Sequence, residues 1–115
     1  MCTYINDPSY FVPTTDVDPV GMSLCEDLPG VSMGDIVKTF PDGVCEEGYY
    51  EPERGYDNSL EVRFVTSDGK YKFNVYSRWG TPRIACYSND NAARTAVPAL
   101  VMHIHQTIGM PNPRR

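Results

Sequence analysis

The dipeptide Asp68-Gly69 constrains the fold of this chain more than any other feature of its sequence. It separates two segments in which apolar and polar residues alternate, as they do in half-buried strands. A type I′ hairpin turn requires positive φ at both central residues, and an Asp-Gly pair accepts that conformation readily. Placing these two residues in the turn fixes the strand pairing, and the central pairs are then Phe64 with Phe73 and Val62 with Val75.

This register sorts the side chains of the hairpin into two faces. The apolar face carries Leu60, Val62, Phe64, Thr66, Tyr71, Phe73 and Val75. The other face is mixed and charged, and it carries Glu61, Arg63, Val65, Lys72, Asn74 and Tyr76. A wrong register would mix the two sets, so the alternation and the turn support each other. Residues 79–82 interrupt the pattern, and residues 83–87 then return as a third strand, which completes a β-meander over residues 60–87.

An amphipathic helix is predicted after the meander. Apolar residues recur at helical spacing, namely Ala93, Val97, Leu100, Ile104 and Ile108, and Gly109 provides a C-terminal stop. Pro98 leaves the start open, because the helix begins either at Thr95, with the proline in its first turn, or at Asn91, with a kink. We favour this helix, with His105 and Gln106 facing outward, over a rival strand at 100–106.

The N-terminal half is rich in proline and polar residues, and its periodicity is poor. Residues 10–12 fit a short edge strand that Pro13 ends. Ser32 and Asp35 form a capping pattern that predicts one short helix of about two turns. Residues 44–58 contain two glycines and a proline, so we expect an exposed loop there, with a strand at 44–47 as an option.

Charge is distributed unevenly along the chain. The 115 residues carry a net charge of −5, but residues 1–57 hold twelve acidic and two basic residues, whereas residues 58–115 hold three acidic and eight basic ones. The acidic balance argues against binding to free nucleic acid, because contacts to phosphates supply most of that affinity. If the basic half folds back onto the acidic half, the charges compensate internally.

Few residues could support metal or thiol chemistry. The cysteines at positions 2, 25, 45 and 86 form no C-x-x-C pair, so the strongest zinc signature is missing. His103 and His105 point about 200° apart on a helix and share a face only on a strand. Cys86 with a histidine of the helix would be a conceivable nucleophile pair, but a small buried residue is the simpler interpretation of Cys86. We therefore predict no metal and no cofactor.

The first residues after Met1 lack the basic segment and apolar core of a secretory signal, and no window approaches the ~18 apolar residues of a membrane span. We accordingly expect a cytoplasmic location with reduced thiols.

The acidic, tyrosine-containing segment is the strongest candidate for a binding surface. Tyrosines bury large areas at small entropic cost, and surrounding carboxylates steer a basic partner toward them. The predicted partner-binding residues are Glu46, Glu47, Tyr49, Tyr50, Glu51, Glu53, Tyr56 and Asp57.

Together these patterns predict a single α+β domain over residues 1–115. An acidic, loop-rich part with one short helix spans 1–58, the β-meander and helix span 59–109, and a flexible tail spans 110–115. The antiparallel sheet is expected to have three to five strands covered by the C-terminal helix.

The predicted function is that of a small, acidic, non-enzymatic protein-binding domain. One form would be an inhibitor or decoy, of the kind that viruses and mobile elements encode, which occupies a basic, nucleic-acid-binding surface of a partner protein. We expect no direct contact with nucleic acid or membrane, and the oligomeric state is open, a dimer included. The alternatives are a small-ligand or metal-binding module that uses the His and Cys residues, and a small Cys/His enzyme.

Overall fold

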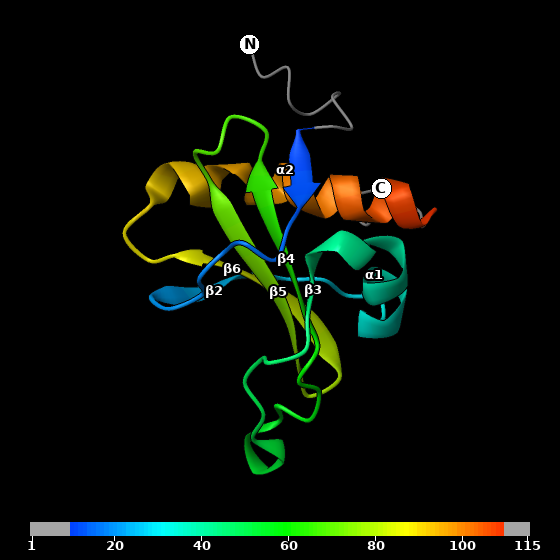
Figure 1. The fold of residues 1–115 in the computed structure, drawn as a ribbon. Helices are drawn as coiled ribbons and strands as arrows, with labels where there is room; N and C mark the ends of the chain where they lie inside the picture. Colours follow the sequence, from blue (N-terminus) through cyan, green and yellow to red (C-terminus); the bar gives the residue numbers. More distant parts are fainter. Residues whose placement is uncertain (1–9, 110–115) are drawn as a thin grey trace.

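The computed structural model describes residues 10–109 and shows an α+β fold built on one antiparallel sheet (Figure 1). Five strands follow the order β1-β4-β5-β6-β2. The sixth, β3, pairs with the N-terminal end of β4, which β1 leaves unpaired. The strands are β1 (Phe11–Pro13), β2 (Met22–Asp27), β3 (Val44–Cys45), β4 (Glu61–Thr66), β5 (Lys72–Arg78) and β6 (Thr81–Tyr87). The sheet therefore has six strands, and the expectation of three to five is too low. The tail predicted at 110–115 and the thiol of Cys2 lie outside the described residues.

The β4–β5 hairpin has the register that the alternation predicts, but its turn is of another type. Phe64 lies opposite Phe73, Val62 lies opposite Val75, and all four side chains are buried. Only Gly69 takes a positive φ in the connection; Asp68 does not, so the turn is not type I′. The Asp68 carboxylate instead accepts hydrogen bonds from the Thr66 hydroxyl and the Lys70 amide, which lowers the pKa of Asp68.

The two-residue turn with two positive φ angles lies between β5 and β6 and consists of Trp79 and Gly80. Trp79 has φ +52, and it is the one non-glycine residue with positive φ in the described part of the chain. Such a conformation costs a bulky side chain roughly 1–3 kcal/mol and persists only where the surroundings enforce it. The position of Trp79 is therefore an unusual choice that calls for a functional explanation.

Strand β2 is an edge strand that the sequence pattern did not indicate. It pairs with β6 through an irregular register, with a shift between Leu24 and Glu26 that leaves Cys25 in a bulge. An edge strand with a bulge need not alternate cleanly, because one of its sides is unpaired. Residues 22–27 belong to the part expected to be loop-rich, and they instead complete the sheet.

The core lies between one face of the sheet and two helices, α1 (Met33–Thr39) and α2 (Asn91–Ile108) (Figure 1). Ser32 caps α1 by accepting a hydrogen bond from the Asp35 amide at 3.1 Å, as the capping pattern predicts. The 3-10 helix η2 (Pro41–Gly43) follows α1 and leads into β3. No helix of residues 10–109 covers the opposite face of the sheet, and we call it the open face.

Helix α2 begins at Asn91, because Asp90 accepts a hydrogen bond from the Ala93 amide at 2.9 Å. The start at Thr95 and the rival strand at 100–106 are both wrong. Pro98 consequently lies inside the helix, where it cannot donate the usual hydrogen bond to the carbonyl four residues back. His105 was expected to face outward, but it is 2% exposed and belongs to the core, whereas Gln106 is exposed.

Within residues 10–109 no helix is long and apolar enough to cross a membrane.

Two thiols meet across the β2–β6 pair. The bulge directs Cys25 toward the core face, where its Sγ atom lies 2.6 Å from that of Cys86. Burial, together with this neighbour, raises the pKa of Cys86 to about 12. Cys86 therefore stays protonated at neutral pH, and Cys25, the more exposed of the two, is the thiol from which oxidation would start.

We expect the isolated protein to alkylate at all four cysteines in denaturant and to lose two reactive thiols after incubation with glutathione disulfide. In that exchange the Cys25–Cys86 disulfide forms and the oxidant leaves as two molecules of glutathione. Mass spectrometry after alkylation measures the change. The Cys45→Ser variant should still form the disulfide, whereas Cys25→Ser should not. A disulfide that involves Cys45 would contradict the pairing.

Candidate functional site

Residues 46–57, which we call the lobe, leave the sheet between β3 and β4 and project from the body of the molecule (Figure 1). The base of the lobe is closed by a hydrogen bond from the Gly48 amide to the Ser59 carbonyl at 2.9 Å. Farther out, Glu51 and Tyr56 form a bridge, with 2.8 Å between the Glu51 amide nitrogen and the Tyr56 carbonyl oxygen. The 3-10 helix η3 (Pro52–Arg54) forms the tip. The predicted exposed loop thus has an ordered internal structure.

A chain of aromatic contacts connects the lobe to the sheet. The rings of Tyr49 and Tyr56 meet edge to face with centroids 4.8 Å apart, and Tyr56 stacks on Tyr76 of β5 at 6.2 Å. The guanidinium of Arg78 lies 4.7 Å from the centroid of the Tyr56 ring. Aromatic and cation–π contacts of this kind contribute about 0.5–1.5 kcal/mol each. They hold the lobe in one orientation against β5.

The Trp79-Gly80 turn makes a second attachment to the lobe. The Trp79 amide donates to the Gly55 carbonyl at 2.8 Å, and the Arg78 Nε donates to the Arg54 carbonyl at 2.9 Å. Gly55 has φ +90, and the indole lies so close to it that an added β-carbon would overlap the ring. A glycine is needed here on both counts. The left-handed backbone of Trp79 belongs to the two-residue turn between β5 and β6, and from this turn the indole docks on Gly55.

Large aromatic surfaces nevertheless remain in solvent around the lobe. Tyr49 is 55% exposed, Tyr50 is 61% exposed and Trp79 is 64% exposed. Large apolar groups exposed together are typical of interaction sites, especially when a rigid framework presents them. The arrangement therefore offers a preformed aromatic surface.

The acidic charge of the lobe is only partly compensated. Five carboxylates face the single cation of Arg54 within residues 46–57. Glu51 pairs with Arg54 at 3.1 Å and accepts a hydrogen bond from the Tyr49 hydroxyl, which raises the pKa of Tyr49. In the described part of the chain, the other four carboxylates form no ion pair; these are Glu46, Glu47, Glu53 and Asp57.

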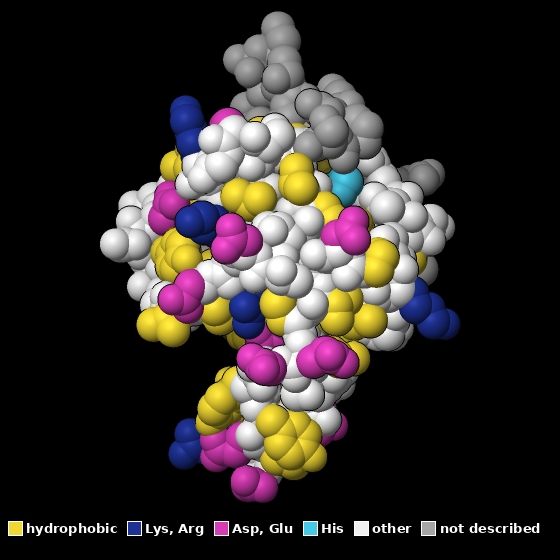
Figure 2. All heavy atoms as spheres, viewed as in Figure 1, with side chains coloured by type: hydrophobic (Ala, Val, Ile, Leu, Met, Phe, Trp, Pro, Cys, Tyr) yellow, Lys and Arg dark blue, Asp and Glu magenta, His cyan; other side chains and the backbone are white. Residues whose placement is uncertain are grey.

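The basic side chains of residues 58–109 form no ion pair with the carboxylates of the lobe. Arg63 pairs with Glu61, and the Nε of Arg83 lies 3.2 Å from the carboxylate of Asp27 without hydrogen-bond geometry. Arg78 donates a hydrogen bond to the Arg54 carbonyl and lies over the Tyr56 ring. Figure 2 shows the result, with acidic side chains at the neck and tip of the projection beside its hydrophobic side chains.

A cleft of about 410 Å³ lies on the open face of the sheet, between the lobe and the segment that connects β1 to β2. Its wall on one side is formed by Pro19 and Val20, and on the other side by lobe residues that include Glu47 and Tyr49. Its floor comes from four strands and consists of Glu61, Arg63, Asn74, Tyr76, Ala85, Met22 and Ser23. Its volume is in the lower part of the range for ligand pockets.

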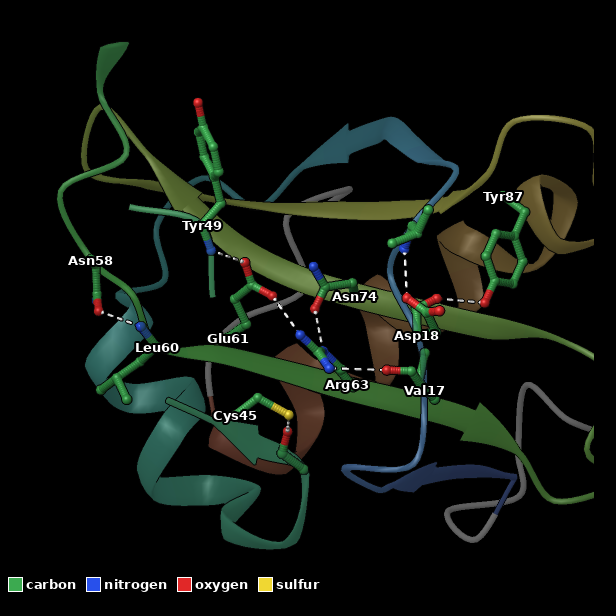
Figure 3. Close-up of polar contacts among 12 residues, drawn as sticks. Val17, Asp18, Cys45, Tyr49, Asn58, Leu60, Glu61, Arg63, Asn74 and Tyr87 are labelled. Carbon is green, nitrogen blue, oxygen red and sulfur yellow. Dashed lines mark hydrogen bonds and ion pairs between the residues drawn. The ribbon is translucent and has the colours of Figure 1, made fainter. Parts of the chain in front are cut away.

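A polar network forms the centre of this floor (Figure 3). Arg63 donates from Nη2 to Glu61 at 3.1 Å, from Nε to Asn74 at 3.3 Å and from Nη1 to the Val17 carbonyl at 2.9 Å. The Tyr49 amide donates to the second oxygen of Glu61 at 3.2 Å. The network thus connects the lobe, the sheet and the segment that contains Val17. Glu61 is only 6% exposed, and burial raises the pKa of Tyr76 beside it.

The structure brings the predicted binding residues together with residues that sequence reasoning missed. All eight predicted residues lie in the lobe; six of them are exposed, and Glu51 and Tyr56 are half-buried. The missed residues are Trp79, Glu61, Arg63 and Asn74. Trp79 could have been noticed because Trp79-Gly80 stands at a hairpin turn, where the pair Asn-Gly is favoured. The signal for the other three was a pair of opposite charges and an amide on the polar face of a confirmed hairpin.

The residues of the alternative functions lie elsewhere. Because residues 100–106 are helical, His103 and His105 diverge; His103 packs beside the rings of Phe11 and Phe40, and burial lowers its pKa. No group of three or more His, Cys, Asp or Glu side chains in residues 10–109 is arranged to hold a metal ion. The buried, protonated thiol of Cys86 lends no support to a nucleophilic role.

Comparison with known proteins found no protein-family model, no curated protein and no solved structure that matches this chain. Its function has to be inferred from its own residues.

Proposed function

We propose that this chain is a small, acidic, non-enzymatic protein-binding domain that occupies a basic surface of a partner protein. A surface that normally binds nucleic acid is the natural target, because it is built to receive closely spaced negative charges. The chain would then act as an inhibitor or decoy in the cytoplasm. The lobe and the Trp79-Gly80 turn are the contact surface.

The observation that carries this proposal is the strained, exposed Trp79. Trp79 occupies a left-handed turn position and its indole lies against Gly55, and yet the residue is 64% exposed. Packing alone gives little reason to retain a tryptophan at a turn position that asparagine or glycine would occupy without strain. Burial of this ring against a partner gives that reason, since tryptophan and tyrosine dominate the energetics of interfaces.

The unpaired carboxylates supply the second part of the interaction. Acidic side chains lie beside the hydrophobic side chains of the lobe (Figure 2), so a basic partner would be attracted before the rings make contact. Association should accordingly be fast at low salt and should slow as the screening length falls from about 10 Å at 0.1 M to about 3 Å at 1 M. The aromatic anchors would mainly set the dissociation rate.

The test compares capture of proteins from a cell lysate by tagged variants of the full chain. We expect the wild type to retain basic proteins that duplex DNA displaces, and the Trp79→Asn variant to lose them. Asparagine suits a turn residue with positive φ, so the hairpin should stay folded when the indole is removed. Circular dichroism and thermal unfolding establish that it does.

Charge reversal provides the matched control for the electrostatic part. The Glu46→Lys/Glu53→Lys variant should lose capture, whereas Asp35→Lys/Asp42→Lys, which changes the net charge equally at helix α1 and the adjoining η2, should retain it. Equal capture by both variants would refute a role for the lobe. Equal loss would mean that only the overall charge matters, and it would refute a defined contact surface.

A further inference from the structure

We infer that the cleft on the open face receives a single arginine side chain of the basic partner. This inference rests on the proposed function and deepens it, because it assigns a specific recognition site beside the more general attraction of the lobe. It starts from the residues that line the cleft, which combine carboxylates with the rings of Tyr49, Tyr56 and Tyr76.

The charges of the cleft favour a cation. Among residues 10–109, its charged lining residues are two carboxylates, Glu47 and Glu61, and one guanidinium, that of Arg63. The guanidinium is already directed to Glu61, Asn74 and a carbonyl oxygen, so its charge is compensated on the floor. Each oxygen of Glu61 accepts one hydrogen bond from the part of the chain that the structure describes, and an ionised carboxylate offers about four acceptor positions. Acceptor capacity and a net negative charge therefore remain for a ligand.

The aromatic lining favours arginine over lysine. A guanidinium is planar, is weakly hydrated and stacks on aromatic faces, while its five N–H groups can reach two carboxylates at once. The chain itself shows that this aromatic cluster accepts such a group, because Arg78 lies 4.7 Å from the centroid of the Tyr56 ring. An ammonium group could use the carboxylates but would gain less from the rings.

The apolar wall suits the aliphatic stem of the same side chain. Val20 is 80% exposed, and it lines the cleft with Pro19 and Met22. The methylene groups of an arginine that enters past this wall would cover it while the guanidinium reaches the polar floor. The cleft thus offers an apolar entrance and a polar end in the order that an arginine requires.

The experiment uses the full chain, labelled with nitrogen-15, and the peptide acetyl-Gly-Arg-Gly-amide as the probe. We expect saturable amide shifts at Asn74, Tyr76 and Ala85, weaker shifts with the lysine peptide, and none with the neutral citrulline peptide. Glu47→Gln should weaken arginine binding about tenfold, the size expected when one charge-assisted hydrogen bond is lost. Glu46→Gln, the same change at the neighbour that does not line this cleft, should leave it unaltered.

Several outcomes would overturn the inference. Binding of the citrulline peptide as tight as that of arginine would show that charge is not recognised, and equal binding of lysine would remove the role of the rings. Absence of any shift, or equal effects of the two Gln variants, would exclude the cleft.

None of these measurements uses the partner protein, so the two proposals can fail separately. If arginine fails to bind but Glu46→Lys/Glu53→Lys still abolishes capture, only the cleft assignment falls. If the arginine peptide binds but charge reversal leaves capture intact, the proposed function is refuted. The arginine could then no longer be assigned to that partner.

Discussion

Truncation of Phe64 to alanine is expected to lower the free energy of unfolding by on the order of 3–5 kcal/mol. Phe64 is fully buried at the centre of the core face, opposite Phe73, and its ring meets that of Phe40 at a centroid distance of 5.0 Å. Its removal leaves a cavity between the sheet and the segment that follows α1, which neighbouring side chains fill only in part. Urea unfolding followed by circular dichroism measures the loss.

The adjacent residue Val65 is the matched control, because it lies on the same strand but faces the other side of the sheet. The Val65→Ala variant should lose no more than about 1 kcal/mol. A domain of this size has a total stability of about 5–15 kcal/mol, so the Phe64→Ala variant is expected to be marginal. Comparable losses in the two variants would contradict the assignment of the core face.

Replacement of Arg63 by methionine is expected to destabilise the fold by on the order of 3 kcal/mol and to disorganise the cleft. The change leaves the carboxylate of Glu61 buried without its cation, and removal of one partner of a buried ion pair is strongly destabilising. It also releases the Val17 carbonyl, through which the arginine holds the segment between β1 and β2. Thermal unfolding and the amide shifts of residues 14–20 report these two effects.

The double variant Glu61→Leu/Arg63→Met separates the ion pair from the packing. An apolar pair of similar volume is often as stable as the buried ion pair that it replaces, so most of the lost stability should return. Cleft binding of the arginine peptide should not return, because the floor no longer carries a carboxylate. If the double variant is no more stable than Arg63→Met alone, Arg63 acts mainly through its other contacts, and the ion pair is not what stabilises the floor.

The central fold was predictable because two independent signals agreed. The alternation in residues 60–76 and the turn at Asp68-Gly69 both indicated the pairing of Phe64 with Phe73, even though the turn itself is of another type. The strand register is set by which side chains are buried. The hydrogen bonds of Asp68 change the type of the turn but not that burial pattern. The helix at the end of the chain was predictable from its apolar spacing, but its start was not, since Asp90 competes with Thr95 as the cap.

Strand β2 could not be recognised from its own residues. The sequence of Met22–Asp27 alternates poorly. This strand pairs along one side only, with β6, and the register of that pairing is irregular. The burial of His105 was missed for a related reason, because a polar residue next to an apolar stripe is assigned to the surface by pattern alone. Both depend on contacts between segments distant in sequence.

The lobe was recognisable by composition, whereas the cleft was not. Acidic residues and tyrosines concentrated within residues 46–57 already indicated a binding surface. The cleft, in contrast, exists only because β2, the segment after β1 and the lobe surround the open face of the sheet. The docking of Trp79 on Gly55 likewise joins two segments that no local pattern relates.

Site-specific photo-cross-linking tests most directly whether the lobe is the contact surface. Benzoylphenylalanine is placed at Tyr50, which is exposed on the lobe, in one protein, and at Gln106, which is exposed on α2, in another. The proposal predicts that irradiation in lysate attaches a basic protein to the chain modified at Tyr50 and that high salt or the Trp79→Asn change suppresses this product. Attachment of the same protein with equal or greater yield from Gln106 would show that the partner binds another face, and it would contradict the proposed function of the lobe.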